Sequence, residues 1–135
     1  MRLKWTIAAL LGLLAVFSLQ GQQKTYQLSS LDIHTGQPAP EVVISLSKLT
    51  PQGEWELLDE KTTDGNGRVK DFLEQDGSDH TGVYKLTYHV GPYFEKQGQN
   101  SFYPFIEVVF RISGSSHYHV PITLSPYGYS TYRGN

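Results

Sequence analysis

The chain has 135 residues, 39% of them hydrophobic, and its 11 basic and 13 acidic residues give a formal net charge of −2. Because the basic residues are interspersed with acidic ones instead of clustered, the sequence argues against a nucleic-acid partner. It contains no cysteine, which excludes disulfides, thiolate metal sites, a cysteine nucleophile and a lipid anchor on an N-terminal cysteine. Ordinary amounts of Gly and Pro indicate one globular domain.

The N-terminal segment differs in character from the rest of the chain. Arg2 and Lys4 precede an apolar run over residues 5–19, and polar residues follow. A charged start and an apolar run this short are typical of a secretory signal, since a spanning helix needs roughly 20 apolar residues. We therefore expect a signal peptide over 1–21, a mature domain over 22–135 without a stable membrane span, and a periplasmic or secreted location. An uncleaved anchor helix is the alternative.

After this segment, apolar and polar residues alternate between short turns, which indicates an all-β sandwich. The clearest case is the segment 41–49, EVVISLSKL. Successive side chains of a strand point to opposite faces, so Val42, Ile44, Leu46 and Lys48 share one face. We expect that face to point toward the core.

One short helix is predicted among the strands, over residues 91–102, because Pro92 suits the first turn of a helix. In chain order the predicted strands cover residues 26–31, 41–49, 55–63, 68–73, 82–90, 105–112, 118–125 and 127–133. No internal repeat or second domain is apparent.

Two patterns suggest a metal site, but neither is complete. The segment 64–68, DGNGR, begins like a calcium loop, but Arg68 and Val69 stand where an EF-hand needs an acid or Asn and then Gly. A hairpin turn that places Arg68 at the start of a strand fits better. His117 and His119 share a strand face, but a catalytic zinc needs a third protein ligand. We therefore expect no metal.

Nucleophilic catalysis by a serine is not predicted, because the sequence has no GxSxG elbow. The remaining candidates are a strand histidine, an arginine after a turn and the tyrosine-rich end YGYSTYRGN. A hydrolase could use these groups without a covalent intermediate, with His119 as the general base for water and Arg68 as an anion or oxyanion partner.

Five segments together resemble the transthyretin-like family over essentially all of residues 26–135: HTGQPAPEVVISL, TTDGNGRVKDF, GVYKLTYHVGPYF, HYHVPITLS and the terminal YGYSTYRGN. The resemblance implies a prealbumin-type sandwich of two four-stranded sheets with one short helix. It also implies a homotetramer whose substrate clefts lie between dimers and include the C-terminus. The hydrolase members of the family imply cleavage of the cyclic amide of 5-hydroxyisourate, a step in urate breakdown, without a cofactor.

Carrying the family's functional positions over one at a time gives a mixed result. The histidine of its HVP motif falls on His119, its turn arginine on Arg68 and its terminal tyrosine on Tyr132. The family's first-strand histidine falls on Ser29, which cannot act as a base near neutral pH. The final residue of the family's Tyr-Arg-Gly-Ser signature is Asn135 here. Ser29, Tyr132 and Asn135 are predicted to contact substrate together with Arg68.

The sequence leaves two functions open. The first is an exported 5-hydroxyisourate hydrolase; the second is a catalytically silent small-ligand-binding protein on the same scaffold, with Ser29 as the mark of lost activity. His34 lies five residues from Ser29, roughly 16 Å along a strand and on its opposite face. It is therefore expected to be a turn residue, unless the register slips or a neighbouring subunit supplies it. A third possibility, a cell-surface sandwich module, is disfavoured by the C-terminal signature.

Overall fold

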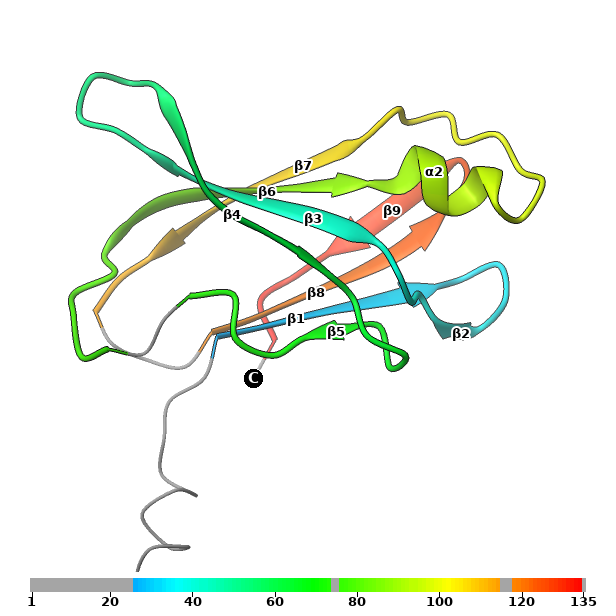
Figure 1. The fold of residues 1–135 in the computed structure, drawn as a ribbon, viewed down its shortest axis with the longest axis horizontal. Coiled ribbons are helices and arrows are strands. Elements are labelled where there is room, and N and C mark those ends of the chain that lie inside the picture. Colours follow the sequence, from blue (N-terminus) through cyan, green and yellow to red (C-terminus); the bar gives the residue numbers. More distant parts are fainter. Residues whose placement is uncertain (1–25, 74–75, 115–117, 135) are drawn as a thin grey trace, which may run out of the picture.

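The computed structural model describes residues 26–73, 76–114 and 118–134, which form two packed β-sheets and one short helix (Figure 1). The first sheet contains β1 (Tyr26–Asp32), β2 (Gln37–Pro38), β5 (Arg68–Val69), β8 (Tyr118–Ser125) and β9 (Gly128–Thr131). The second contains β3 (Val43–Leu49), β4 (Trp55–Thr62), β6 (Gly82–His89) and β7 (Ile106–Ile112). The predicted all-β sandwich with one short helix is confirmed.

The first sheet joins the two ends of the described chain. Its strand order is β2-β1-β8-β9, and β1 runs parallel to β8 along its whole length. β2 and β5 both pair with β1 in antiparallel fashion at different residues, so they lie one after the other along its second edge. The sheet is therefore four strands wide although it has five strands. The second sheet is antiparallel throughout, in the order β4-β3-β6-β7.

The core lies between the two sheets, as the alternation in the segment 41–49 predicted. Val42, Ile44 and Leu46 are buried, while Lys48 is half-buried with its Nζ 5.4 Å from the centre of the Tyr84 ring. The lysine stem therefore covers apolar surface while its charge stays near water.

The helix α2 (Val90–Glu95) is shorter than the predicted 91–102. After it the chain turns through Gly98, which has a φ of +71°. The Tyr93 hydroxyl donates a hydrogen bond of 2.8 Å to Oδ2 of the buried Asp32, which ties α2 to the end of β1. Burial, together with this hydrogen bond to a carboxylate, raises the pKa of Tyr93 to about 12.

One predicted strand is much shorter than expected. Residues 68–73 were predicted as a strand, but β5 ends at Val69, and the chain then bends so that Phe72 and Leu73 are buried in the core. An apolar pair at the end of a strand pattern can thus mark a bend into the core.

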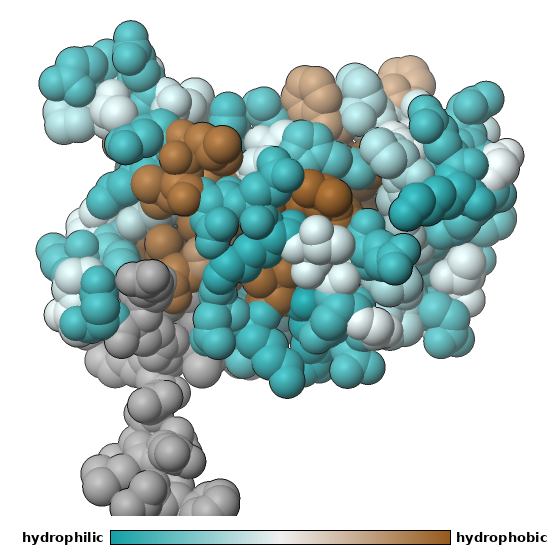
Figure 2. Space-filling view, in the orientation of Figure 1, coloured by the Kyte–Doolittle hydropathy of each residue, from teal (hydrophilic) through white to brown (hydrophobic). Residues whose placement is uncertain are grey.

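β4 is an edge strand, and its Trp55 and Leu57 are exposed. The face of the molecule shown in Figure 2 is mainly hydrophilic, with apolar areas between the hydrophilic ones.

The N-terminal prediction concerns residues 1–21, which lie outside the described residues. Among the residues that are described, there is no helix with the length and apolar character needed to cross a membrane.

Candidate functional site

Three of the predicted site residues lie on the outer face of the first sheet, on three different strands. Ser29 comes from β1, Arg68 from β5 and His119 from β8. In each strand the next residue is buried against the core. Because side chains alternate along a strand, Ser29, Arg68 and His119 point away from the core and share one face.

Ser29 and His119 are in direct contact. The Ser29 Oγ lies 2.9 Å from the His119 Nε2, although the two residues are ninety positions apart in the chain. The parallel register explains the contact, because it places Ser29 opposite Pro121, two residues beyond His119 on β8. Both side chains are half-buried. The sheet therefore brings a hydroxyl and an imidazole together on a partly solvated surface.

Arg68 lies directly opposite Ser29 in the antiparallel pairing of β1 with β5. Directly opposed residues have Cβ atoms about 4.5–5.5 Å apart and project from the same face. Gly67 makes this approach possible: its φ is +71°, and a Cβ there would lie 2.4 Å from the backbone oxygen of Ser30. A residue with a side chain at position 67 would push β5, and Arg68 with it, away from β1.

The turn before Arg68 is held by the carboxylate of Asp64. Its Oδ1 accepts hydrogen bonds from the backbone N–H of Asn66 at 2.9 Å and of Arg68 at 3.0 Å. The backbone N–H groups of Arg68 and then of Asn66 hold the pKa of Asp64 below its usual value. The support that the carboxylate gives the turn is therefore present at neutral pH and is lost as the pH falls through this lowered pKa.

The C-terminal segment packs against His119. The Gly134 N–H donates a hydrogen bond of 2.8 Å to the backbone oxygen of His119, forming an isolated antiparallel bridge. A Cβ at position 134 would lie 2.7 Å from the His119 Nδ1 and 3.0 Å from its Cγ. Only glycine allows the chain to pass this close to the ring, so Gly134 fixes one side of the imidazole.

We expect Gly134→Ala to displace the imidazole of His119 from Ser29, because the added methyl group would overlap Nδ1. The thermal unfolding midpoint should change little, since the bridge lies at the edge of the sheet. The hydrolysis assay described below should show a loss of turnover, and Gly128→Ala, whose Cβ has room in the β8–β9 turn, is the matched control. Equal turnover in both variants would contradict the positioning role of Gly134.

A cavity of about 230 Å³ lies beside the site, between β7 and β8, where β9 has ended. It is lined by residues 108–111, 118–120 and 131–133. Tyr132 is 61% exposed, and the Arg133 guanidinium carbon lies 4.9 Å from the centre of the Tyr118 ring. His119 lines this cavity, whereas Ser29 and Arg68 do not. Tyr132 and His119 therefore line the same cavity, and Asn135 lies outside the described residues.

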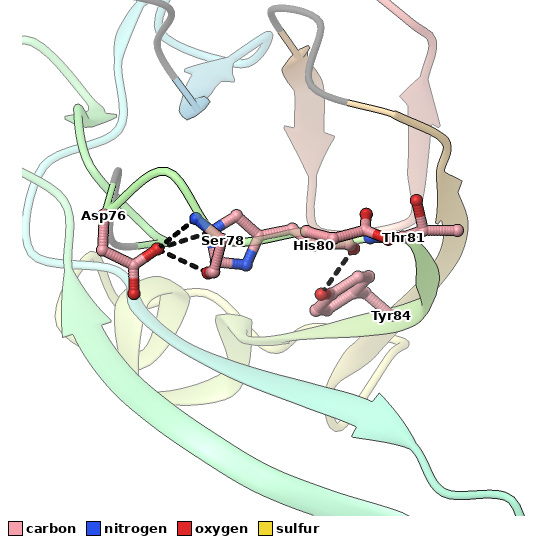
Figure 3. A network of polar contacts seen from close by, with 6 residues as sticks. Asp76, Ser78, His80, Thr81 and Tyr84 are labelled. Carbon is pink, nitrogen blue, oxygen red and sulfur yellow. Dashed lines mark hydrogen bonds and ion pairs between the residues drawn. The ribbon is translucent and has the colours of Figure 1, made fainter.

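The other histidines of the described chain have different surroundings. His80 forms an ion-pair contact of 3.7 Å with Asp76, in a loop where the Tyr84 hydroxyl donates to the His80 backbone oxygen (Figure 3). This network holds the approach to β6. His34 lies in the turn after β1, where its backbone N–H bonds the Asp32 carboxylate at 2.9 Å. The predicted turn position of His34 is confirmed for the single chain.

His89 forms a second serine–histidine contact, on the other sheet. Its Nε2 lies 2.9 Å from the Ser45 Oγ, and the same hydroxyl donates a hydrogen bond of 3.1 Å to the Glu60 carboxylate. Glu60 and His89 thus both contact the serine, whereas in a catalytic triad the acid contacts the histidine.

Within 26–73, 76–114 and 118–134 there is no group of three or more His, Asp or Glu side chains that could hold a metal ion. The predicted partner of His119 in such a site, His117, lies outside the described residues.

Sequence reasoning missed the supporting roles of Asp64 and Gly134. A signal for Asp64 was present, because Asp followed by Gly and Asn is typical of a turn in which the side chain bonds nearby N–H groups. Gly134 is part of the terminal YRGN, but its contact with His119 depends on a pairing that no local pattern encodes.

Residues 27–134 match the model of the HIUase/Transthyretin family. A protein of Caenorhabditis elegans named as a probable 5-hydroxyisourate hydrolase is 45% identical over 106 residues, which cover 78% of this chain and 77% of the relative. The 5-hydroxyisourate hydrolase of Salmonella dublin is 37% identical over 131 residues, covering 96% of this chain and 95% of its own.

Solved structures of both branches of this family superpose on the chain. The 5-hydroxyisourate hydrolase of Klebsiella pneumoniae gives a TM-score of 0.71 at 35% identity, covering 84% of this chain and 100% of the other. Sea bream transthyretin in complex with thyroxine gives a TM-score of 0.75 at 29% identity, and the superposition covers 81% of this chain and 93% of the transthyretin chain. The fold is therefore similar to that of an enzyme and that of a binding protein, and the residues of the site must distinguish them.

Proposed function

This chain belongs to the HIUase/transthyretin family, and from that premise we propose that it hydrolyses 5-hydroxyisourate by opening the cyclic amide in urate degradation. The observation that carries the proposal is the contact of His119 with Ser29, with Arg68 opposite Ser29 on the same sheet face. This arrangement combines a base (His119), a hydroxyl group (Ser29) and a positive charge (Arg68). Relatives named for this activity support the same substrate.

Each residue has a distinct role in the proposed reaction. His119 is the general base for the hydrolytic water, a role that suits a half-buried imidazole because it can exchange protons with solvent. Arg68 binds the purine-derived anion and stabilises the oxyanion that forms when the carbonyl is attacked. Tyr132, at the edge of the cavity, and Asn135, assigned from the sequence alone, complete the substrate contacts.

The test is the rate at which freshly generated 5-hydroxyisourate disappears, followed by absorbance with and without the purified chain. We expect a rate well above the spontaneous background and proportional to the enzyme concentration. The competing function is a silent binding protein, which the serine at position 29 favours. A rate equal to the background from a folded protein would contradict the hydrolase and support the binding protein.

We further propose that the chain assembles as a homotetramer. Exposed aromatic residues gather near its C-terminus, where Tyr127 is 76% exposed, and closed symmetry would cover such surfaces. Sedimentation at micromolar concentration is expected to give the mass of four chains. A monomer under these conditions would contradict the assembly and any substrate cleft between subunits.

Export is proposed from the sequence of the N-terminal segment. The mature chain is expected to begin between about Gln20 and Lys24, because the apolar run is short and follows a charged start. Intact-mass measurement of protein from the periplasm or the medium tests this. A membrane-bound chain that retains Met1 would contradict it.

A further inference from the structure

The hydroxyl of Ser29 is placed where a serine nucleophile would be. Its Oγ lies 2.9 Å from the His119 Nε2, and a nucleophile and its base are typically 2.6–3.2 Å apart. We infer that Ser29 attacks the cyclic amide and that the reaction passes through an ester on Ser29. This inference rests on the proposed function and assigns to Ser29 a catalytic role that the resemblance to the family does not imply.

The direction of the hydrogen bond decides whether the serine can be activated. In the described part of the chain, His119 is the side chain that hydrogen-bonds the Ser29 hydroxyl. The single hydroxyl proton can therefore be donated to Nε2 when the imidazole is neutral and its proton is on Nδ1. In this tautomer His119 is ready to accept the proton as Oγ attacks.

The pair formed by Ser45 and His89 provides an internal comparison. Its Oγ to Nε2 distance is also 2.9 Å, but the Ser45 hydroxyl donates its proton to Glu60. The imidazole of His89 must then donate to Ser45 and cannot act as its base. Ser45 is also only 8% exposed. At equal distances the two hydroxyls thus differ in where the proton can go: that of Ser45 goes to Glu60, whereas that of Ser29 can go to His119, as nucleophilic attack requires.

Two further features support Ser29 as the reacting group. Arg68 projects from the position opposite Ser29, so its positive charge lies on the face where an oxyanion would form. Gly134 packs against the His119 ring beside Nδ1 and Cγ, and this contact limits how the ring can rotate. The base is thus held in place by a third group, as nucleophilic catalysis generally requires.

The first half of the reaction forms the ester. His119 Nε2 takes the proton from Ser29 Oγ while this oxygen adds to the amide carbonyl carbon, and Arg68 stabilises the resulting oxyanion. The oxyanion then collapses and the ring carbon–nitrogen bond breaks. The imidazolium gives its proton to the leaving nitrogen, so that Ser29 carries the opened substrate as an ester.

The second half releases the product. Water adds to the ester carbonyl and gives its proton to His119, the bond from carbon to Oγ breaks, and Oγ recovers that proton. The net reaction adds one water molecule to the cyclic amide and needs no oxidant or reductant. His119 therefore remains the base for water, but the water attacks an ester instead of an amide.

The first experiment is independent of the natural substrate and uses p-nitrophenyl acetate as an activated acetyl ester. We expect a burst of p-nitrophenolate proportional to enzyme concentration, and peptide mass mapping after acid quench should place the acetyl group on Ser29. Ser29→Ala should abolish the burst, while Ser45→Ala, which alters the comparison pair, should retain it. A burst that persists in Ser29→Ala, or no acetyl group on Ser29 in the wild type, would overturn the inference.

The second experiment uses 5-hydroxyisourate with acid quench during turnover. Because the amide is cyclic, the leaving nitrogen stays attached, so the adduct should have the mass of the enzyme plus the whole substrate. Ser29→Ala should lose the adduct and about 10²-fold or more of turnover, the usual contribution of one positioned proton transfer. Turnover by the wild type without any adduct, and without acetylation in the first experiment, would refute the nucleophile while the proposed hydrolase stands. Turnover at the background rate would refute the proposed hydrolase, and the acetyl assay would still decide whether Ser29 is reactive.

Discussion

His119→Ala is expected to lower kcat/KM for 5-hydroxyisourate by about 10²–10⁴-fold, the contribution typical of one positioned general base. The reason is specific to its position, because the imidazole contacts Ser29 and His119 is one of the residues that line the neighbouring cavity. The backbone hydrogen bond to Gly134 does not involve the side chain, so the C-terminal segment should remain in place. Circular dichroism and sedimentation of the variant check that fold and assembly are retained.

The matched control for His119→Ala is His34→Ala. His34 is an exposed histidine in the turn after β1, and the hydrogen bond found there uses its backbone N–H. The control should have wild-type turnover. Loss of activity in His34→Ala would mean that a neighbouring subunit supplies His34 to the site, and unchanged activity in His119→Ala would contradict the assignment of the base.

Arg68→Ala is the second change with a large expected effect, a loss of about 10²–10³-fold in kcat, which is typical when one oxyanion-stabilising group is removed. Arg68 is exposed, and the turn before it is held through its backbone N–H by Asp64, so the fold should not change. Arg68→Lys should recover only part of the loss, because a lysine keeps the charge but not the planar, two-pronged donor of arginine. Steady-state kinetics should therefore give the highest kcat for the wild type, an intermediate kcat for Arg68→Lys and the lowest kcat for Arg68→Ala.

Lys70→Ala controls for general electrostatic attraction of an anionic substrate. Lys70 is an exposed cation two residues after Arg68, and Lys70→Ala changes the net charge by the same amount as Arg68→Ala. Its effect should be small and should disappear as salt is added, since surface charges are screened over about 8–10 Å. If Lys70→Ala and Arg68→Ala lose the same activity, Arg68 acts only through the overall charge of this surface.

The strands were predicted well where the side-chain pattern is local. Val42, Ile44 and Leu46 alternate with polar residues, and this alternation alone places them in the core. The prediction was wrong where tertiary packing decides the outcome. Phe72 and Leu73 extend an apparent strand pattern, but β5 pairs with β1 through Arg68 and Val69, and the chain then bends and buries Phe72 and Leu73 in the core.

The residues of the candidate site were predicted from the sequence, but the contacts between them were not. The resemblance named Ser29, Arg68 and His119, yet no local pattern could show that Ser29 contacts His119. That contact depends on the parallel register of β1 against β8, which is set by the packing of the whole sheet. For the same reason the sequence favoured an interpretation of Ser29 as the loss of a base. The structure instead places the Ser29 hydroxyl in contact with His119, the base that is still present.

The parallel pairing of β1 with β8 also sets an order of events during synthesis. β2 and β5 follow β1 closely in the chain and can pair with one of its edges early, but the other edge has no partner until β8 has been made. At 5–20 residues per second, the ninety positions between Ser29 and His119 take about 5–18 s to translate. During this interval β1 exposes unpaired backbone N–H and C=O groups, which favour wrong pairing between nascent chains. Ribosome pausing between β5 and β8 should therefore lower the yield of active protein more than pausing after β9.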